Sequence, residues 1–471
     1  MKEIITGRLE YKNVEFLFVF DGEVLRLIPP KEKEQEIKFE WIKAPLGDGV
    51  YMEGKKCIMN EPFLKGVCNE NGHHFIFFTT VGDTIRNKDV ILFINIYGYI
   101  DLNLKKVEIC KIKFMCPEIN YIYPSNQALD IISDDKDISE NGIIALKTKG
   151  IDSAKTDKRD FIVDDIKVSV FFGISKVLNT GIDEAPLTIN SSMNFEFEAT
   201  SNYSFIMRLC EIAREFIRLL CYRKNVAWSK VELYSRTNEK KIFKLGELFI
   251  VENQEQKDTN TLEKGTYINQ KYIDGYEGKI LSDLARSVLY TRHIPETYIT
   301  GTKIDASRFI MITSAFEWEF DRRYPDGVPK KDDTIKIEKQ AEMAIQDLID
   351  KSRGKLKSKY KFLKKLIKSD SLQIKIIKIG EDYDSIIGGL GKKLYDINNI
   401  KFSYNDMGER IAKQRNRFAH GDLNINFNGE SLCDLKYMEY MIYALQLKGY
   451  GVSDENICKS INELFHLNAE L

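Results

Sequence analysis

The sequence lacks any apolar segment long enough to cross a membrane. Its longest apolar run, ILFINIYGYI at residues 91–100, is about half of the ~20 residues that a membrane helix needs. The first residues, MKEIITGRLEYK, also lack the apolar stretch and the small-residue cleavage site of a secretory signal. We therefore expect a cytoplasmic protein with no membrane contact.

Cysteine and histidine are sparse, which disfavours disulfide and metal frameworks. The eight cysteines are scattered along the chain, a distribution typical of reduced thiols. Cys57, Cys68, His73 and His74 could in principle form a zinc site, but they lack the closely spaced cysteine pair that usually starts one. Adjacent histidines on a strand would also point to opposite faces. We expect no metal ion.

The other familiar catalytic patterns are also missing. The segment GGLGKKL resembles a phosphate loop, but Ile386 stands where that motif needs its first glycine and Lys393 where it needs a hydroxyl residue. Outside one cluster near residue 420, the histidines are too scattered to suggest a Ser-His-Asp or Cys-His arrangement. We therefore expect neither nucleotide binding at GGLGKKL nor a hydrolytic triad.

The composition is that of a folded protein with more than one domain. A chain of 471 residues is too long for one ordinary core, and 43% hydrophobic residues against 30% charged exclude a disordered chain. The first 200 residues contain short β-branched and aromatic segments such as VEFLFVF, HHFIFFTT and IKVSVFFGI. These segments predict an antiparallel sandwich or a barrel-like assembly.

A helical pattern first appears at residues 204–223. There, apolar side chains fall on one helical stripe, formed by Phe205, Leu209, Ile212, Phe216 and Leu220. Two predicted strands, KVELYSR and KIFKLGELFIV, and then the polar segment ENQEQKDTNTLEKGT follow. We place the domain boundary in this polar segment, with a β-rich region at 1–264 and a helical domain at 265–471.

The second half has the apolar period of helices. We expect helices at 278–291, 306–320, 334–352, 359–369, 404–420, 432–449 and 454–467, and a looser one at 380–394. Asp305 is placed to cap the second of these helices, and Gly421 is placed to end the helix 404–420. The fold class predicted is therefore an α+β multidomain protein with a C-terminal all-α bundle.

The formal net charge of −1 conceals a strongly basic segment. Between Lys351 and His420 there are 18 Lys and Arg against 7 Asp and Glu. A local positive field of this kind attracts polyanions, and nucleic acid above all.

The basic segment ends in QRNRFAHGD, which places Arg415, Asn416 and His420 near a helix end. On a helix, Asn416 and His420 lie about 40° apart on one face, and the long side chain of Arg415 can reach it. Histidine transfers protons near neutral pH, and arginine grips phosphate oxygens. Together they could drive attack of a ribose 2′-hydroxyl on its own phosphodiester without a metal or cofactor, leaving a 2′,3′-cyclic phosphate. Alternatively, basic residues in a last turn only complement the helix dipole.

The cluster also carries a family resemblance. Arg415-Asn416-x-x-x-His420 resembles the R-N-x-x-x-H motif of HEPN ribonucleases, and SAFEWEF is similar to the alanine-hydrophobic-glutamate segment of many HEPN helices. A β-rich half before a terminal HEPN domain resembles the ApeA family of bacterial anti-phage proteins. This layout covers nearly the whole chain, and the individual motifs lie in its last 200 residues.

The resemblance implies a function and a set of roles. Two HEPN bundles would pair as a homodimer and cut RNA without metal, in anti-phage defence by abortive infection set off by a phage-derived trigger. Arg415 would stabilise the phosphate, His420 would transfer the proton, Asn416 would orient the site, and Glu317 would pair with Arg415. The RNA that is cut, transfer RNA or phage message, is left open.

Further basic residues are candidates for RNA contact. Lys413 and Arg417 lie beside the motif, and Lys357, Lys361 and Lys364 lie in a run from Lys351 to Ser369 with nine basic residues and no acid. We expect these lysines to face solvent, opposite an apolar side formed by Tyr360, Phe362, Leu363, Leu366 and Ile367. A simple solvated face is the alternative. The corresponding alternative for the whole protein is a non-catalytic, dimerising RNA-binding or ligand-binding protein.

Overall fold

The computed structural model describes residues 4–468 with several gaps. The gaps are 55, 105–107, 134–137, 139, 141, 143–144, 151–153, 180, 182–184, 186, 252–265, 331, 369 and 420–426. The chain forms two compact units. Unit 1 comprises Met1–Arg218, Asn225–Leu262 and Glu277–Arg286, and unit 2 comprises Leu219–Lys224, Glu263–Tyr276 and Ser287–Leu471. An α+β architecture in two parts is therefore present.

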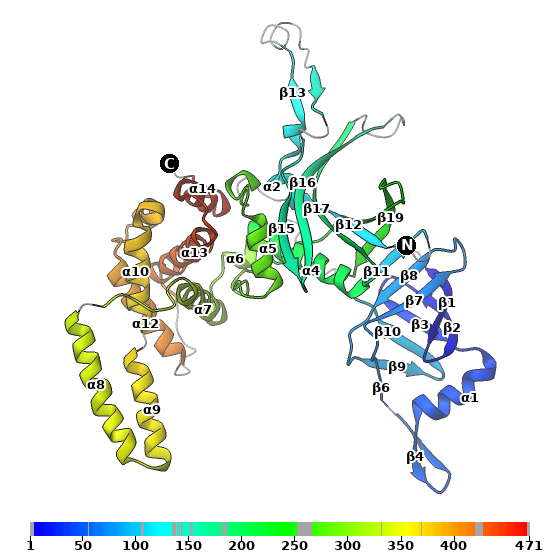
Figure 1. Ribbon diagram of the computed structural model, residues 1–471, viewed down its shortest axis with the longest axis horizontal. Coiled ribbons are helices and arrows are strands. Elements are labelled where there is room, and N and C mark those ends of the chain that lie inside the picture. The colour runs from blue at the N-terminus through cyan, green and yellow to red at the C-terminus, as the bar shows by residue number, and fades with distance from the viewer. Residues whose placement is uncertain are drawn as a thin grey trace. The chain divides into compact units, whose positions relative to one another are not determined.

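Unit 1 is built on one continuous antiparallel sheet of 15 strands (Figure 1). Their order is β15-β16-β17-β12-β18-β19-β11-β8-β7-β1-β2-β3-β10-β9-β6. The strands are β1 Ile5–Tyr11, β2 Val14–Phe20, β3 Val24–Ile28, β6 Cys57–Ile58, β7 Phe63–Cys68, β8 His74–Phe78, β9 Thr84–Lys88, β10 Ile91–Asn95, β11 Gly98–Leu102, β12 Ile109–Met115, β15 Arg159–Val163, β16 Ile166–Leu178, β17 Leu187–Thr200, β18 Lys230–Arg236 and β19 Ile242–Ile250. Two small sheets pair β4 Lys43–Gly47 with β5 Val50–Glu53 and β13 Leu129–Ile131 with β14 Leu146–Thr148.

The alternation of buried and exposed side chains along the strands explains the hydrophobic core around β2. In β2, VEFLFVF, every second side chain is buried, and Phe16, Phe18 and Phe20 are at most 1% exposed. Phe18 and Phe20 both pack edge-on against Phe77 of β8, with ring centroids 5.2 and 5.0 Å apart. Each such side chain contributes roughly 1.5–3 kcal/mol through its burial.

Helices in unit 1 are few among the described residues. The short helices α1 Glu34–Ile37 and α2 Pro117–Ile122 lie between strands, and α5 Glu277–Ala285 packs on β15. The predicted amphipathic helix is α4, Tyr203–Cys221, and all five residues of its predicted stripe are buried. Its last residues, from Leu219, belong to unit 2.

Unit 2 is helical. Its helices are α6 Tyr298–Gly301, α7 Ala306–Arg323, α8 Asp332–Lys351, α9 Gly354–Lys368, α10 Leu372–Tyr383, α11 Gly389–Ile397, α12 Tyr404–Ala419, α13 Gly429–Tyr450 and α14 Asp454–Leu464. The looser predicted segment contains a π-helical turn at Asp384–Gly388 between α10 and α11. Asp305 caps α7 as predicted, accepting a hydrogen bond from the Arg308 backbone at 2.8 Å. Gly421, the predicted end of α12, lies outside the described residues.

The two units of the structure do not divide the chain at the single predicted boundary, residue 264. The prediction assigns each half of the chain to one domain. In the structure, the end of α4 joins the helical unit and α5 joins the sheet unit. The predicted helix at 278–291 is also shorter, because α5 ends at Ala285.

Two glycines allow α12 to lie close to α10. A Cβ on Gly380 of α10 would lie 2.4 Å from the ring of Tyr404, and a Cβ on Gly408 of α12 would lie 3.1 Å from the Gln373 backbone oxygen. A larger residue at either position would push the two helices apart. The glycines therefore fix the position of the helix that carries Arg415.

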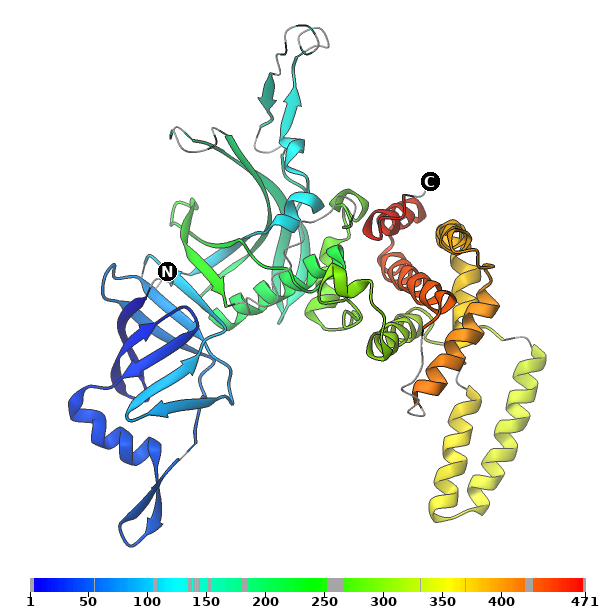
Figure 2. The same cartoon turned by 180° about the vertical axis from the view of Figure 1, so that it is seen from behind.

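Helices α8 and α9 form an antiparallel hairpin, which both cartoon views show as a separate arm of unit 2 (Figures 1 and 2). The sequence predicted that the apolar side of α9 lies away from solvent, and two of its residues correct this prediction. Phe362 is 58% exposed and Leu363 is 44% exposed, because α9 packs chiefly on α8. Tyr360 and Ile367 are half-buried, and the side chain of Leu366 lies outside the described set.

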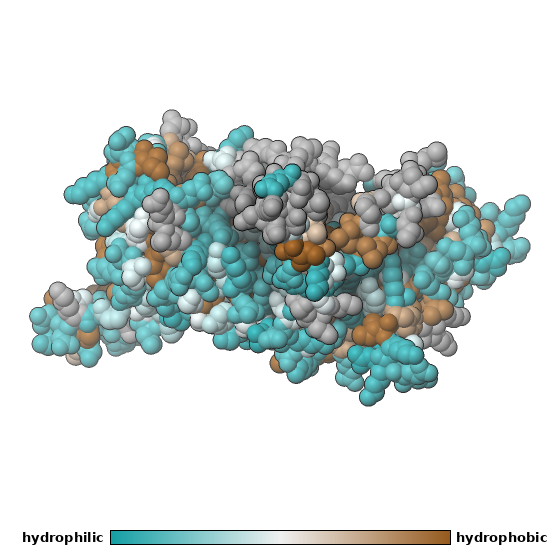
Figure 3. Space-filling model, turned by 90° about the horizontal axis from the view of Figure 1, so that it is seen from above, coloured by the Kyte–Doolittle hydropathy of each residue, from teal (hydrophilic) through white to brown (hydrophobic). Residues whose placement is uncertain are grey.

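The next features are the character of the surface and the state of the cysteines. Among the residues coloured in Figure 3, hydrophilic ones predominate on the face shown, with separate apolar patches. All eight cysteines are free thiols, and seven of them are buried. In the part of the chain that the structure describes, no helix combines the length and the apolar character needed to cross a membrane.

The core of unit 2 contains a buried histidine, His293, which is 1% exposed. Burial lowers its pKa to about 4; Glu439 opposes this shift, and the cations Arg308 and Lys224 add to it. The folded protein therefore keeps His293 neutral under conditions in which an unfolded chain would protonate it.

We expect the free energy of unfolding to decrease by about 3 kcal/mol through His293 as the pH falls from about 6.5 to about 4. The sign follows because the unfolded histidine binds a proton in this range and the folded one does not, so the stability is fully present above the ordinary pKa. Urea denaturation at about pH 7 and about pH 4.5 measures the effect. A His293→Phe variant should lose this part of the pH dependence, and an unchanged dependence would contradict the assignment.

Candidate functional site

Helix α12 presents its basic residues to solvent because its apolar residues occupy the opposite face. Met407, Ile411 and Phe418 are buried. The exposed side carries Lys413, Arg415, Asn416 and Arg417. The sequence predicted these four residues as one group, and the structure places them along the last two turns of one helix.

Arg415 contacts the glutamate that was paired with it on sequence grounds. Its Nη2 donates to Oε2 of Glu317 on α7 at 2.6 Å, with side-chain exposures of 45% for Arg415 and 22% for Glu317. An ion pair this exposed contributes only about 0–1 kcal/mol to stability. Its effect is therefore on the direction of the guanidinium, which is held beside α7 and remains open to solvent.

A Glu317→Gln variant tests this positioning role. We expect a change of under about 1 kcal/mol in the free energy of unfolding, because the pair is exposed. Any activity that depends on Arg415 should decrease about tenfold, since a neutral amide holds the guanidinium less firmly than a carboxylate. Glu409→Gln, on the exposed side of α12, is the matched control. Equal activity of the two variants would contradict a role for Glu317.

A second arginine fixes the rotation of α12. Arg410 donates from Nε and Nη2 to the two oxygens of Asp434 on α13, both at 2.7 Å. Asp434 is 1% exposed and also accepts from Tyr395 Oη of α11 at 2.5 Å. The hydrogen bonds to Asp434 raise the pKa of Arg410. Three helices are thus tied together less than two turns before Arg415.

The two described ends of the segment 420–426 are also held together. Gln414 on α12 donates to the Ser431 hydroxyl, and the Ser431 hydroxyl and backbone both donate to Asn428, the cap of α13. Phe418 and Phe427 lie with ring centroids 5.9 Å apart, and both contact Phe309 of α7. His420 lies outside the described residues, within a segment whose flanking residues are fixed on both sides.

The described part of the site carries groups whose chemistry suits a phosphate. Arg415 is a half-exposed guanidinium with its direction set by Glu317, and Lys413 and Arg417 add positive charge on the same helix. A planar guanidinium offers a bidentate grip on phosphate oxygens. Across the described residues, no group of three or more His, Cys, Asp and Glu side chains is arranged to hold a metal ion.

The predicted lysines of α9 differ among themselves. Lys361 is exposed, as expected for RNA contact, whereas Lys357 is half-buried. Lys364 is half-buried, and its Nζ donates to Oε1 of Gln346 on α8 at 2.8 Å. Lys364 therefore helps to join the hairpin, and the structure does not leave it on an open face.

Reversing two of the predicted RNA-contacting charges of α9 tests RNA contact. A Lys357→Glu, Lys361→Glu variant should bind single-stranded RNA more weakly and with a shallower salt dependence, by about 0.7 in the log–log slope for each phosphate that the protein no longer neutralises. Filter binding over a range of salt concentrations measures both quantities. Lys240→Glu, Lys241→Glu at the β18–β19 turn makes the same charge change in unit 1. The α9 assignment fails if both double variants bind RNA equally.

The residues that hold the site in place, Arg410, Asp434, Tyr395 and Gln414, were not predicted from the sequence. One signal was available: Asp434 is an acidic residue near the start of a long apolar helix, where burial requires a partner. The identity of that partner was not readable, because Arg410 and Asp434 come from different helices.

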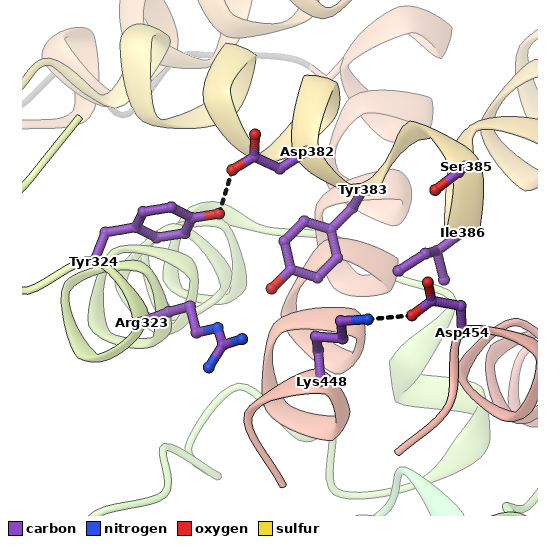
Figure 4. A pocket seen from close by; sticks show the side chains of 8 residues that line it. All are labelled: Arg323, Tyr324, Asp382, Tyr383, Ser385, Ile386, Lys448 and Asp454. Carbon is purple, nitrogen blue, oxygen red and sulfur yellow. Dashed lines mark hydrogen bonds and ion pairs between the residues drawn. The ribbon is translucent and has the colours of Figure 1, made fainter. Parts of the chain in front are cut away.

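A separate recess of about 400 Å³ lies elsewhere on unit 2 (Figure 4). It is lined by Arg323, Tyr324, Asp382, Tyr383, Ser385, Ile386, Lys448 and Asp454. Its charges largely pair internally, since Lys448 binds Asp454 and Tyr324 donates to Asp382 at 2.5 Å. Burial raises the pKa of both tyrosines, which keeps them protonated. None of the predicted site residues lines this recess, and its balanced charge favours no particular ligand.

No known protein family, curated protein or solved structure matches the chain.

Proposed function

We propose that the protein is a metal-independent endoribonuclease of the HEPN type that acts in anti-phage defence. The observation that carries the proposal is the 2.6 Å contact between Arg415 and Glu317. These two residues are 98 positions apart, and the motif resemblance alone predicts that they pair. A basic helix end that only complements the helix dipole requires no such partner.

The proposed reaction forms one bond and breaks one. The ribose 2′-oxygen attacks the adjacent phosphorus, its proton passes to the imidazole of His420, and the bond from phosphorus to the 5′-oxygen breaks. The departing 5′-oxygen takes up a proton, so no water or oxidant is consumed. Arg415 offsets the negative charge that develops on the phosphoryl oxygens in the transition state. The product carries a 2′,3′-cyclic phosphate.

The proposal also specifies an assembly. Under it, unit 2 is a HEPN bundle that pairs with a second copy, and the two Arg415-His420 sets share one cleft. The β-rich unit, with a sandwich or barrel-like core, would sense a phage-derived trigger in the cytoplasm and keep the nuclease inactive until infection. RNA is the partner, and transfer RNA and phage message remain alternative substrates.

The test is an RNA digest in EDTA. Purified protein is incubated with total cellular RNA, with and without extract from infected cells, and the fragment ends are analysed. We expect fragments with cyclic phosphate ends, and their loss in Arg415→Ala. Lys459→Ala, which changes an α14 lysine that pairs with Glu455, is the control and should cut normally. Absence of cleavage under both conditions would contradict the proposal.

A specific observation favours a second candidate, a non-catalytic RNA-binding or dimerising protein. The α8–α9 hairpin combines exposed lysines with exposed apolar side chains, among them Ile337 at 65% and Phe362 at 58%. Such a surface suits docking without any chemistry. Under this alternative, the wild-type protein and Arg415→Ala alike would leave RNA intact in every reaction, and binding would depend on the hairpin alone.

A further inference from the structure

Unit 2 contains a recess of about 370 Å³ that the proposed nuclease chemistry does not use. Its lining includes Tyr222, Leu432, Lys436, Leu464 and Phe465. The volume is that of a small-molecule site, and the walls are largely apolar with a few polar groups. None of these residues belongs to the Arg415 cluster.

The lining carries one charge. Among the described residues that line the recess, Lys436 is the only charged side chain, and no Asp or Glu lies among them. Its ammonium lies 4.3 Å from the ring centroid of Phe465 and 5.5 Å from that of Tyr222. These cation–π contacts hold the ammonium beside two aromatic rings of the wall.

The cluster that Lys436 joins has a surplus of positive charge. Glu439 is 1% exposed and uses both carboxylate oxygens, one for Arg308 at 2.6 Å and one for Lys436 at 2.9 Å. Arg308 also donates to the Tyr222 hydroxyl at 3.0 Å. His293 adds no charge near neutral pH, because burial keeps its pKa low. Two cations therefore share one carboxylate.

Because Arg308 and Lys436 share the single negative charge of Glu439, their charge is only partly compensated, and an anion bound beside the apolar wall would compensate the remainder. We propose that this recess binds a small molecule with a flat apolar body and one anionic group, such as a carboxylate, sulfonate or phosphate. The anionic group would lie against Lys436, and the apolar body would pack on Phe465, Tyr222 and Leu432. This site is independent of the proposed nuclease function.

Two fluorescent probes with the same ring system test the proposal. Anilinonaphthalene sulfonate carries one anionic group, and N-phenylnaphthylamine is its uncharged counterpart. Each is titrated into the full-length protein. We expect one saturable site that favours the sulfonate, and Lys436→Met should weaken sulfonate binding about tenfold, the effect of removing one charged hydrogen bond, without changing binding of the neutral probe.

Three further variants make the result decisive. Lys436→Arg keeps the charge and should keep the preference for the sulfonate. Leu432→Trp fills the recess from its partly exposed rim and should weaken both probes. Lys459→Met, which removes a lysine of α14, should change neither. The proposal is overturned if Lys436→Met and Lys459→Met bind the sulfonate equally, or if Leu432→Trp binds both probes like the wild type, since the probes would then be bound elsewhere.

Discussion

Replacing His420 with alanine is expected to lower RNA cleavage by about 10²–10⁴-fold, the usual contribution of a general base or acid. The imidazole would accept the proton of the attacking 2′-hydroxyl, and alanine offers no acceptor. Arg415 and the nearby lysines would still bind the phosphate in this variant. The effect should therefore appear in the cleavage rate and not in RNA affinity, which single-turnover kinetics and filter binding separate.

The control for His420→Ala is a second histidine, which is exposed. His466 lies just beyond α14 and outside the α12 cluster, so His466→Ala should cut RNA at the wild-type rate. The His420 variant should also keep its melting temperature and oligomeric state, because the fixed contacts on either side of its segment involve other residues. A His420→Ala protein that cuts RNA normally would remove the histidine from the mechanism.

The largest expected effect on stability comes from Asp434→Ala, with a loss of about 3–5 kcal/mol. Asp434 is buried and receives two hydrogen bonds from Arg410 and one from Tyr395. Alanine would leave the guanidinium and the tyrosine hydroxyl without their acceptor in the core. The loss should appear as a lower urea midpoint for unfolding of the helical unit.

Asp434→Ala should also reduce cleavage, because the contacts that fix the orientation of α12 about its own axis near Arg415 would be lost. Tyr395→Phe removes only one of the three hydrogen bonds and should cost about 1 kcal/mol. The order of stability should therefore be wild type, Tyr395→Phe and Asp434→Ala. Equal stability of Asp434→Ala and wild type would show that the buried network does not hold the three helices together.

Local sequence patterns predicted most of the helices and several of the strands, because these elements follow local rules. The strand KVELYSR is β18 with the same bounds, and the stripe of α4 is buried as its period required. The prediction assigned no element to residues 371–379, which form most of α10; this segment is rich in β-branched isoleucine, which favours strands over helices. Ser371 caps this helix, and the burial of Ile376 and Ile379 in the bundle stabilises it.

Features that depend on distant contacts were less accessible. The exposure of Phe362 could not be read from α9 alone, since it depends on which helices pack beside the hairpin. The strand order of the sheet, with β12 between β17 and β18, is likewise set by pairing between distant segments. Local alternation fixes which face of a strand is buried, but it does not identify the neighbouring strand.

In the candidate site, too, some residues could be predicted from a sequence motif, and others depend on contacts between distant segments. Arg415 and Glu317 could be paired in advance because a family motif links them across 98 positions. Arg410 and Asp434 had no such motif, and their pairing depends on how α12 rotates against α13. The reactive residues were thus more predictable than the residues that hold them in place.

The most direct measurement uses one RNA whose cleaved bond has been mapped and a matched strand with a single 2′-deoxynucleotide on the 5′ side of that bond. The proposed reaction requires the 2′-hydroxyl as its nucleophile, so the all-ribose strand should be cut in EDTA to a cyclic phosphate end. The substituted strand should stay intact at that bond. Cleavage of both strands at equal rates would contradict attack by the 2′-hydroxyl and, with it, the role assigned to Arg415 and His420.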